Sequence, residues 1–220
     1  MNGSLVSASA YTDTGLTGGV SYYYVIRAVD TSAQESANSS EDFAIPYSIL
    51  IASTDSYVNQ QSESTNYGSS ATLEVKSKKQ GPNQRNERTF ASFDVSSIPG
   101  GSTISSATLT LCATSVPSSR TYDAHRVTAS WTEAGVTWNN QPAVAGSATA
   151  SAGTPGSPGC MTWTVTSDVQ LWVDGTSNYG WRISDASEGS SQERLTVFRS
   201  TEDGAVPADQ PHLQVSWTVP

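Results

Sequence analysis

The sequence has little of what most architectures other than β-sheet require. Only 14% of its 220 residues are charged, and no uninterrupted apolar run approaches the roughly 18 residues of a membrane span. A coiled coil or long-helix protein would need far more Ala, Glu, Lys, Leu and Arg. Disorder is also disfavoured, because six Trp and nine Tyr offer large apolar surfaces for burial. The composition predicts an all-β protein without a membrane span.

Positive charge is scarce as well. The chain carries 11 basic and 20 acidic side chains, a net charge of −9, so we expect no nucleic-acid partner. Common catalytic motifs are missing: there is no Gly-x-Ser-x-Gly, no His-Glu-x-x-His and no phosphate-binding Gly-x-x-x-x-Gly-Lys. These absences favour a protein that is not an enzyme. Paired carboxylates for glycoside hydrolysis stay open, because their spacing is spatial.

Two cysteines and two histidines, not at ligand-like spacing, are too few for a zinc site. A disulfide between Cys112 and Cys160 would close a loop of about 48 residues and stabilise the fold by ~4 kcal/mol in the loop-entropy model. The secreted-type composition favours this disulfide, and the alternative is a pair of buried thiols.

The first part of the chain differs in texture from the rest. Residues 22–30 alternate as a strand, after a glycine-rich turn at 15–19 and before a polar stretch at 35–40. The segments YTDTGLTGG, YYYVIRAVD and ESANSSE resemble the C-terminal half of a fibronectin type III domain. A whole domain of that kind has seven strands, so we expect residues 1–47 to be a truncated remnant within a larger multi-domain protein. Met1 is followed by Asn-Gly-Ser, so no signal peptide is expected in this fragment.

From residue 48 to residue 220, short β-like runs alternate with clusters of Gly, Pro, Asn and Ser. About ten strands with turns between them predict a jelly-roll-like β-sandwich. One short helix is expected, with an N-cap from Thr166, Ser167 or Asp168 and a stop at Gly175. The expected strands lie near residues 70–77, 89–95, 104–113, 122–127, 161–165, 180–183, 195–198 and 212–217.

An ordered set of motifs in this second part carries a family resemblance. The motifs are NYG at 66–68, FDVSSIP at 93–99, WTEAGVTWNNQP at 131–142, NYGW at 178–181 and PHLQV at 211–215. Together they resemble the DNRLRE domain, which overlaps carbohydrate-binding module family 96. The resemblance implies a secreted, extracellular, non-catalytic module that binds polysaccharide, including acidic glycans such as alginate. Such a module would be covalently linked to a carbohydrate-active enzyme.

The placement of positive charge points to a binding surface. All three lysines and two of the eight arginines fall between residues 76 and 88. Alternation places the first two lysines outward, and a hairpin would set an arginine and a phenylalanine beside them. Cations would bind uronate carboxylates and a ring would cover a sugar face. In related alginate-binding modules, basic residues of this hairpin are implicated in binding. The predicted site is Lys76, Lys78, Lys79, Arg85, Arg88 and Phe90, and the alternative is a solvated hairpin that keeps an edge strand soluble.

The tryptophans divide into two predicted groups. We expect Trp131, Trp138 and Trp172 to be structural, because buried indoles dominate sandwich cores. Trp163 and Trp181 are the better candidates for stacking on a sugar. A structural spacer or adhesin repeat without a ligand is the competing function.

Two further chemistries are considered. A polyuronate lyase would need a base and a charge neutraliser, which His125 with Arg126 and Tyr122 could supply. A structural calcium ion is left open, because jelly-roll modules often hold one through acidic and carbonyl oxygens. No EF-hand-like spacing occurs, and Asp55 and Asp94 are only nominal ligand candidates.

Overall fold

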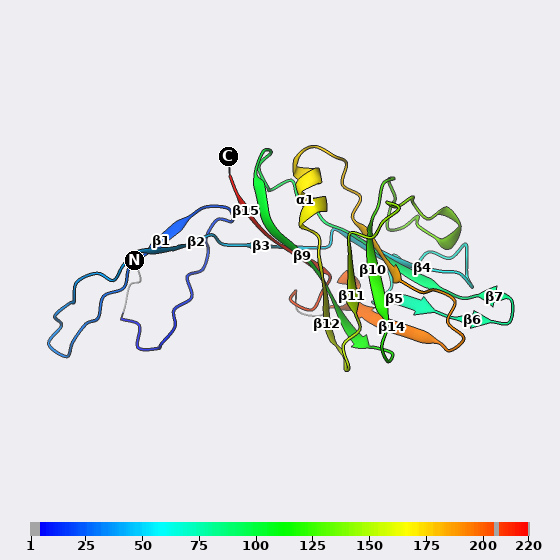
Figure 1. Cartoon of the computed structure of the whole chain (residues 1–220), viewed down its shortest axis with the longest axis horizontal. Helices are drawn as coiled ribbons and strands as arrows, with labels where there is room; N and C mark the ends of the chain where they lie inside the picture. Colours follow the sequence, from blue (N-terminus) through cyan, green and yellow to red (C-terminus); the bar gives the residue numbers. More distant parts are fainter. Residues whose placement is uncertain (1–4, 205–206, 220) are drawn as a thin grey trace.

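Short alternating runs form the strands of one curled antiparallel sheet, which closes as a β-sandwich (Figure 1). The computed structural model describes residues 5–204 and 207–219. The all-β jelly-roll-like prediction is confirmed. No helix within the described part of the chain is long and apolar enough to cross a membrane.

The sandwich begins with β3 and ends with β15. Its strands are β3 (Ser48–Ile51), β4 (Thr54–Asn59), β5 (Thr72–Ser77), β6 (Lys79–Gln80), β7 (Asn83–Gln84), β8 (Glu87–Ser92), β9 (Thr103–Ser115), β10 (Thr121–Arg126), β11 (Ala150–Gly153), β12 (Gly159–Thr164), β13 (Trp181–Asp185), β14 (Arg194–Arg199) and β15 (His212–Thr218). The helices are η1 (Trp138–Asn140), α1 (Thr166–Val173) and η2 (Thr201–Asp203).

Hydrogen-bonded neighbours run in the order β11-β10-β13-β8-β5-β14-β9-β15-β3, with β4 beside β8 and β12 beside β9. The long β9 pairs with three strands, β12, β14 and β15. β5 and β8 pair at one position, Lys76 with Glu87, and the Thr89 hydroxyl adds a hydrogen bond to the Glu74 carbonyl (3.0 Å). The strands β6 and β7 form a separate small ribbon at the tip of the hairpin that runs from β5 to β8.

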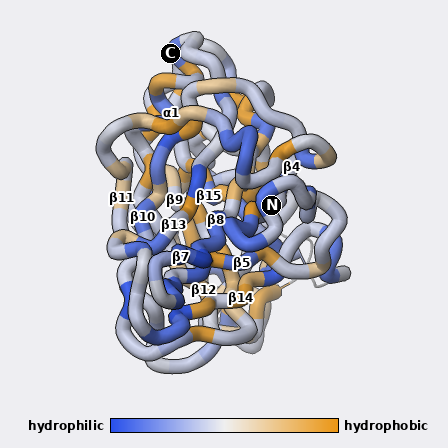
Figure 2. Tube along the Cα trace, turned by 90° about the vertical axis from the view of Figure 1, so that its right-hand side faces the viewer, coloured by the Kyte–Doolittle hydropathy of each residue, from blue (hydrophilic) through white to orange (hydrophobic). Residues whose placement is uncertain are grey.

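Large apolar side chains fill the space inside the curled sheet, and the orange hydrophobic stretches of Figure 2 follow its strands. Trp163 and Trp181 are 1% and 0% exposed, so the prediction that they could stack on a sugar is wrong. Each indole is held by a hydrogen bond, from Trp163 Nε1 to the Tyr122 carbonyl (2.9 Å) and from Trp181 Nε1 to Asp168 Oδ2 (2.8 Å). Buried indoles are stable where their N–H finds an acceptor, and both do.

Cys112 and Cys160 lie opposite each other on β9 and β12, and the structure joins them by a disulfide. The bond connects segments 48 residues apart in the sequence. It therefore ties two neighbouring strands that already pair through their backbones.

Helix α1 lies where the sequence places it and is followed by Gly175, which has a φ of 101°. Its N-cap differs from the prediction, because Val165 occupies that position without a side-chain cap. The expected capping side chains serve other partners. Thr166 Oγ1 accepts a hydrogen bond from the Ala107 N–H (2.9 Å), and Asp168 is one of the buried acceptors of the core. Tertiary contacts thus replaced local capping.

The segment before β3 lies beside the sandwich and folds little structure of its own (Figure 1). Within residues 5–47 the strands are β1 (Tyr22–Tyr24) and β2 (Asp42–Ala44), which pair with each other, so the strand is shorter than the predicted 22–30. Its contact with the sandwich includes Gly19, where a Cβ atom would lie 2.2 Å from the indole nitrogen of Trp217. Only a residue without a side chain allows that approach.

Candidate functional site

A small second core covers the outer face of β8. It consists of Val58, Phe90, Val127 and Val136, with Trp131 and Trp138 packed against it. The 127–149 loop, which connects β10 to β11, supplies four of these six residues.

The packing of the 127–149 loop on β8 explains why Phe90 is buried. The ring points away from the main core, as the alternation predicts, yet it is 0% exposed and lies 5.6 Å from the Trp131 ring. The expectation that Phe90 offers a surface for a sugar is therefore wrong. Its role is to anchor the loop that covers it.

An Asn-Tyr-Gly turn holds the loop at one end. The Asn66 side chain accepts a hydrogen bond from the Gly68 N–H (3.1 Å) and donates to the carbonyls of Glu133 (2.6 Å) and Val136 (2.7 Å). A Cβ atom on Gly68 would lie 2.4 Å from the Glu133 carbonyl oxygen, so this turn requires glycine.

A second Asn-Tyr-Gly turn holds the loop from the other side. The Asn178 side chain accepts a hydrogen bond from the Gly180 N–H (3.0 Å), and the Tyr179 carbonyl accepts one from Trp131 Nε1 (2.9 Å). Gly180 has a φ of 73° and approaches the Ala91 carbonyl too closely for any side chain. Both Asn-Tyr-Gly turns of the sequence thus hold the 127–149 loop in place.

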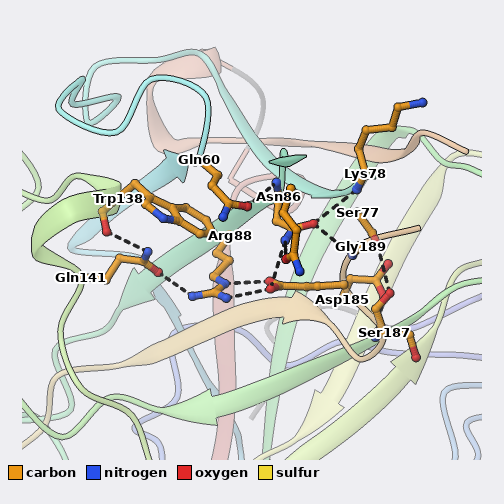
Figure 3. Close-up of polar contacts among 12 residues, drawn as sticks. Gln60, Ser77, Lys78, Asn86, Arg88, Trp138, Gln141, Asp185, Ser187 and Gly189 are labelled. Carbon is orange, nitrogen blue, oxygen red and sulfur yellow. Dashed lines mark hydrogen bonds and ion pairs between the residues drawn. The ribbon is translucent and has the colours of Figure 1, made fainter. Parts of the chain in front are cut away.

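Arg88, one of the predicted binding cations, is in contact with the 127–149 loop. Its guanidinium binds both carboxylate oxygens of Glu188 at 2.7 Å, donates to Gln141 Oε1 (3.1 Å) and stacks on the Trp138 ring at 4.5 Å (Figure 3). Two of these partners, Trp138 and Gln141, belong to the 127–149 loop. Much of the charge of Arg88 is therefore already balanced by the protein.

Lys76 does not reach the surface. It is 8% exposed and forms an ion pair with Glu87, which also accepts a hydrogen bond from Asn59 Nδ2 (2.7 Å). Burial raises the pKa of Glu87, and the nearby carboxyl of Glu74 adds to this rise while Lys76 opposes it. The prediction that Lys76 faces a ligand is wrong, because β4 and β8 both contribute polar groups that enclose it.

The other predicted cations stay together at the tip of the hairpin. Lys79 is exposed, Lys78 and Arg85 are partly exposed, and the Arg85 N–H donates to the Lys78 carbonyl (2.9 Å). In Figure 3 the side chain of Lys78 extends away from Arg88. A groove of about 490 Å³ lies beside this tip, lined by Gln60, Gln61, Glu63, Pro82, Asn83, Gln84 and Arg85.

A second groove, of about 240 Å³, lies on the outer face of β10, β13 and β8. It is lined by Arg88, Asp123, His125, Arg182, Ser184, Asp185, Ala186 and Glu188. Arg182 is its distinctive member. The buried Nε of Arg182 has no hydrogen-bond partner among the described residues, and burial together with the nearby Arg88 lowers its pKa to about 10. The side chain is still a cation at neutral pH.

Sequence reasoning missed Arg182, although a signal existed. It stands between Trp181 and Ile183, two buried residues of β13, so alternation alone places it on the outer face. Nothing in the local sequence indicates that Glu188 pairs with Arg88 and leaves Arg182 without an ion pair among the described residues.

The proposed lyase set does not assemble. Tyr122 is 0% exposed and its hydroxyl bonds to Thr196 (2.7 Å), while Arg126 pairs with Asp168 (3.2 Å). His125 lines the second groove instead, with Nδ1 3.2 Å from the Ala145 carbonyl.

The two nominal calcium ligands differ sharply. Asp94 is exposed, and hydrogen bonds from Ser96 lower its pKa. Asp55 is buried and has one carboxylate oxygen close to those of Glu133 and Glu202. Of the acidic groups named from the sequence, only Asp55 belongs to a cluster that could hold a cation.

The model of carbohydrate-binding module family 96 matches residues 46–216, which is nearly the whole sandwich. The chain belongs to this family. Family 96 membership supports the prediction that this part of the chain is a carbohydrate-binding module. A comparison with curated proteins found no match.

Proposed function

We propose that this family 96 module binds acidic, uronate-containing polysaccharides such as alginate, and thereby holds an appended carbohydrate-active enzyme at its substrate. The observation that carries the proposal is the Arg182 side chain, which lines the groove on the outer face of the sheet and forms no ion pair with any described residue. Arg182 is only partly exposed, and its nearest carboxylate, Glu188, is already bound by Arg88, so a ligand carboxylate would add a counter-charge of its own.

The other groups of this groove suit a sugar. Glu188 and Asp185 are engaged by Arg88 and Arg120, so they compete little for Arg182. His125 and Ser184 can exchange hydrogen bonds with sugar hydroxyls. Arginine binds carboxylates through two parallel N–H donors, which gives geometric selectivity for a uronate over a neutral sugar.

The tip of the hairpin extends the proposed binding surface. Lys78, Lys79 and Arg85 stay part of the proposal, beside a groove rich in amide side chains. Asn86 links the two grooves, with its Nδ2 2.8 Å from Gln84 Oε1 and 3.4 Å from Glu188 Oε2. A chain of several sugar units could therefore contact both. Lys76 and Phe90, also in the predicted set, support this surface from beneath.

We also propose that residues 5–46 are the end of a fibronectin type III domain and that the module is one part of a secreted multi-domain protein. The support is the open apolar surface of this segment. Tyr23, Ile26 and Phe43 are 65%, 75% and 57% exposed, as expected where the rest of a sandwich is missing.

Affinity electrophoresis of the full chain against alginate, pectate and a neutral glucan tests the binding proposal. We expect retention by the acidic glycans only, weakening as salt increases, because exposed charges are screened over roughly 8–10 Å. Arg182→Ala should weaken retention about tenfold, the loss of one charge-assisted interaction of roughly 1.5 kcal/mol. The double variant Lys79→Ala/Arg85→Ala should weaken it several-fold. Arg194→Ala, whose side chain lines neither groove, is the matched control.

Three results would contradict the proposal. Absence of retention at any ionic strength would favour a structural spacer. Equal retention of Arg182→Ala and Arg194→Ala would remove the groove as the site. New ultraviolet absorbance from unsaturated uronate would identify a lyase.

A further inference from the structure

Three carboxylates from distant parts of the sequence converge at one end of the sandwich. Asp55 lies on β4, Glu133 in the 127–149 loop and Glu202 on η2, and one oxygen of each lies within 4.8 Å of the others. Within residues 5–204 and 207–219, no Lys, Arg or His forms an ion pair with any of the three. The like charges therefore have no visible protein counter-charge.

Asp55 is the unusual member of the cluster. Its side chain is 1% exposed; Oδ2 accepts a hydrogen bond from the Thr201 N–H (2.9 Å), but Oδ1 is buried without a partner among the described residues. Buried carboxylate oxygens are nearly always paired or bound to a metal.

Hydrogen bonds from β4 and η2 hold the three carboxylates in place. Glu133 Oε1 accepts a hydrogen bond from the Asp55 N–H (2.8 Å), and Glu202 Oε1 accepts one from the Thr201 hydroxyl (3.0 Å). In each carboxylate, one oxygen thus accepts a hydrogen bond and the second oxygen could bind an ion. Acidic residues that merely share a surface would be free to turn apart.

We propose that Asp55, Glu133 and Glu202 bind a calcium ion. Calcium takes oxygen ligands at 2.3–2.6 Å, so two oxygens that share one ion lie no more than about 5 Å apart, and the three oxygens here, all within 4.8 Å of one another, meet that condition. Water and backbone oxygens would complete the six to eight ligands that calcium prefers. The inference is independent of the glycan proposal.

The ion would have a structural effect on the binding face. Glu133 belongs to the loop that places Trp138 and Gln141 against Arg88. Calcium would fasten this loop to β4 and η2 at a point where three negative charges otherwise repel one another.

Thermal unfolding of the full chain, first stripped with EDTA and then titrated with calcium, tests this site. A ligand that binds only the native state raises Tm, and at a concentration ~100 times its Kd we expect a rise of roughly 5–10 °C for a chain of this size. The variants Asp55→Asn and Glu202→Gln should lose most of the rise. The matched control is Glu193→Gln, an exposed carboxylate outside the cluster, which should keep it.

The decisive result is a reversal of order. In EDTA, Glu202→Gln should be at least as stable as the parent chain, because it removes one of three repelling charges; in calcium it should be less stable. A residue with only a structural role would lower Tm in both conditions. Glu202 is exposed, so this variant should fold even where Asp55→Asn does not.

The proposal is overturned if calcium leaves Tm unchanged or if the control loses the same shift. It is also overturned if magnesium at equal concentration gives the same rise. Magnesium demands a smaller, near-octahedral site, so an equal effect would indicate nonspecific screening of an acidic surface.

Discussion

The base and the tip of the hairpin from β5 to β8 use the same residue types for different tasks. At the base, Lys76 pairs with Glu87 and Arg88 with Glu188. At the tip, Lys79 and Arg85 have no ion pair with any described residue and border an open groove. Five cations that are neighbours in sequence are thus divided by burial.

Positive charges that are clustered in the sequence therefore need not form one exposed binding surface in the fold. A cation that becomes buried needs a partner from the protein, whereas one at a hairpin tip is stabilised by water and stays free for a ligand. Stability should therefore depend on the base, and salt-sensitive binding on the tip and on Arg182.

Removal of Lys76 should give the largest loss of stability. Lys76→Met leaves the buried Glu87 without its counter-charge, and breaking a buried ion pair typically costs 3–5 kcal/mol, so we expect a decrease of about 3 kcal/mol in the free energy of unfolding at pH 8. Urea denaturation measures it. Lys79→Met at the tip should change stability by less than about 0.5 kcal/mol. Equal losses for the two variants would end the distinction between base and tip.

Arg88 should have an intermediate effect. Arg88→Ala removes the bidentate ion pair with Glu188 and the stacking on Trp138. Because Arg88 and Glu188 are both partly exposed, we expect a decrease of about 2 kcal/mol in the free energy of unfolding. Tryptophan fluorescence should report a looser 127–149 loop. Arg85→Ala is the matched control, and a similar fluorescence change in that variant would refute the role given to Arg88.

The sequence predicts which way the strands face but not what covers them. Leu73 and Val75 point into the core and Lys76 away from it, as period-two alternation requires. Lys76 and Phe90 are nevertheless buried, by β4 and β8 in one case and by the 127–149 loop in the other. Burial of an outer face depends on how a loop packs, and alternation carries no information about loops.

Contacts between residues far apart in the sequence could not be predicted for a similar reason. Arg88 and Glu188 are 100 positions apart, and Asp55 and Glu133 are 78 positions apart. Turns, the helix and the core positions follow from local chemistry, because each depends on a few neighbouring residues. The grooves, the lone Arg182 and the acidic cluster depend on which strands become neighbours in the sheet.

The smallest predicted effect concerns Glu74, which lies near the Lys76–Glu87 pair. Because burial and Glu74 raise the folded-state pKa of Glu87, the folded state holds a proton more tightly than the unfolded chain, in which a Glu has a pKa of about 4.3. The contribution of Glu87 is therefore fully present below about pH 4.3 and is lost as pH rises through its folded pKa.

Glu74→Gln should reduce that loss. Without the like charge the folded pKa of Glu87 falls, and since one pKa unit corresponds to about 1.4 kcal/mol, we expect the variant to be about 1 kcal/mol more stable than the parent chain at pH 8 and nearly equal to it at pH 4.5. Urea denaturation across this range measures the difference. Glu63→Gln, which is away from Glu87, should show a constant offset. A gain for Glu74→Gln that did not grow with pH would mean that Lys76 alone determines the ionisation of Glu87, and that the base of the hairpin is a simple ion pair.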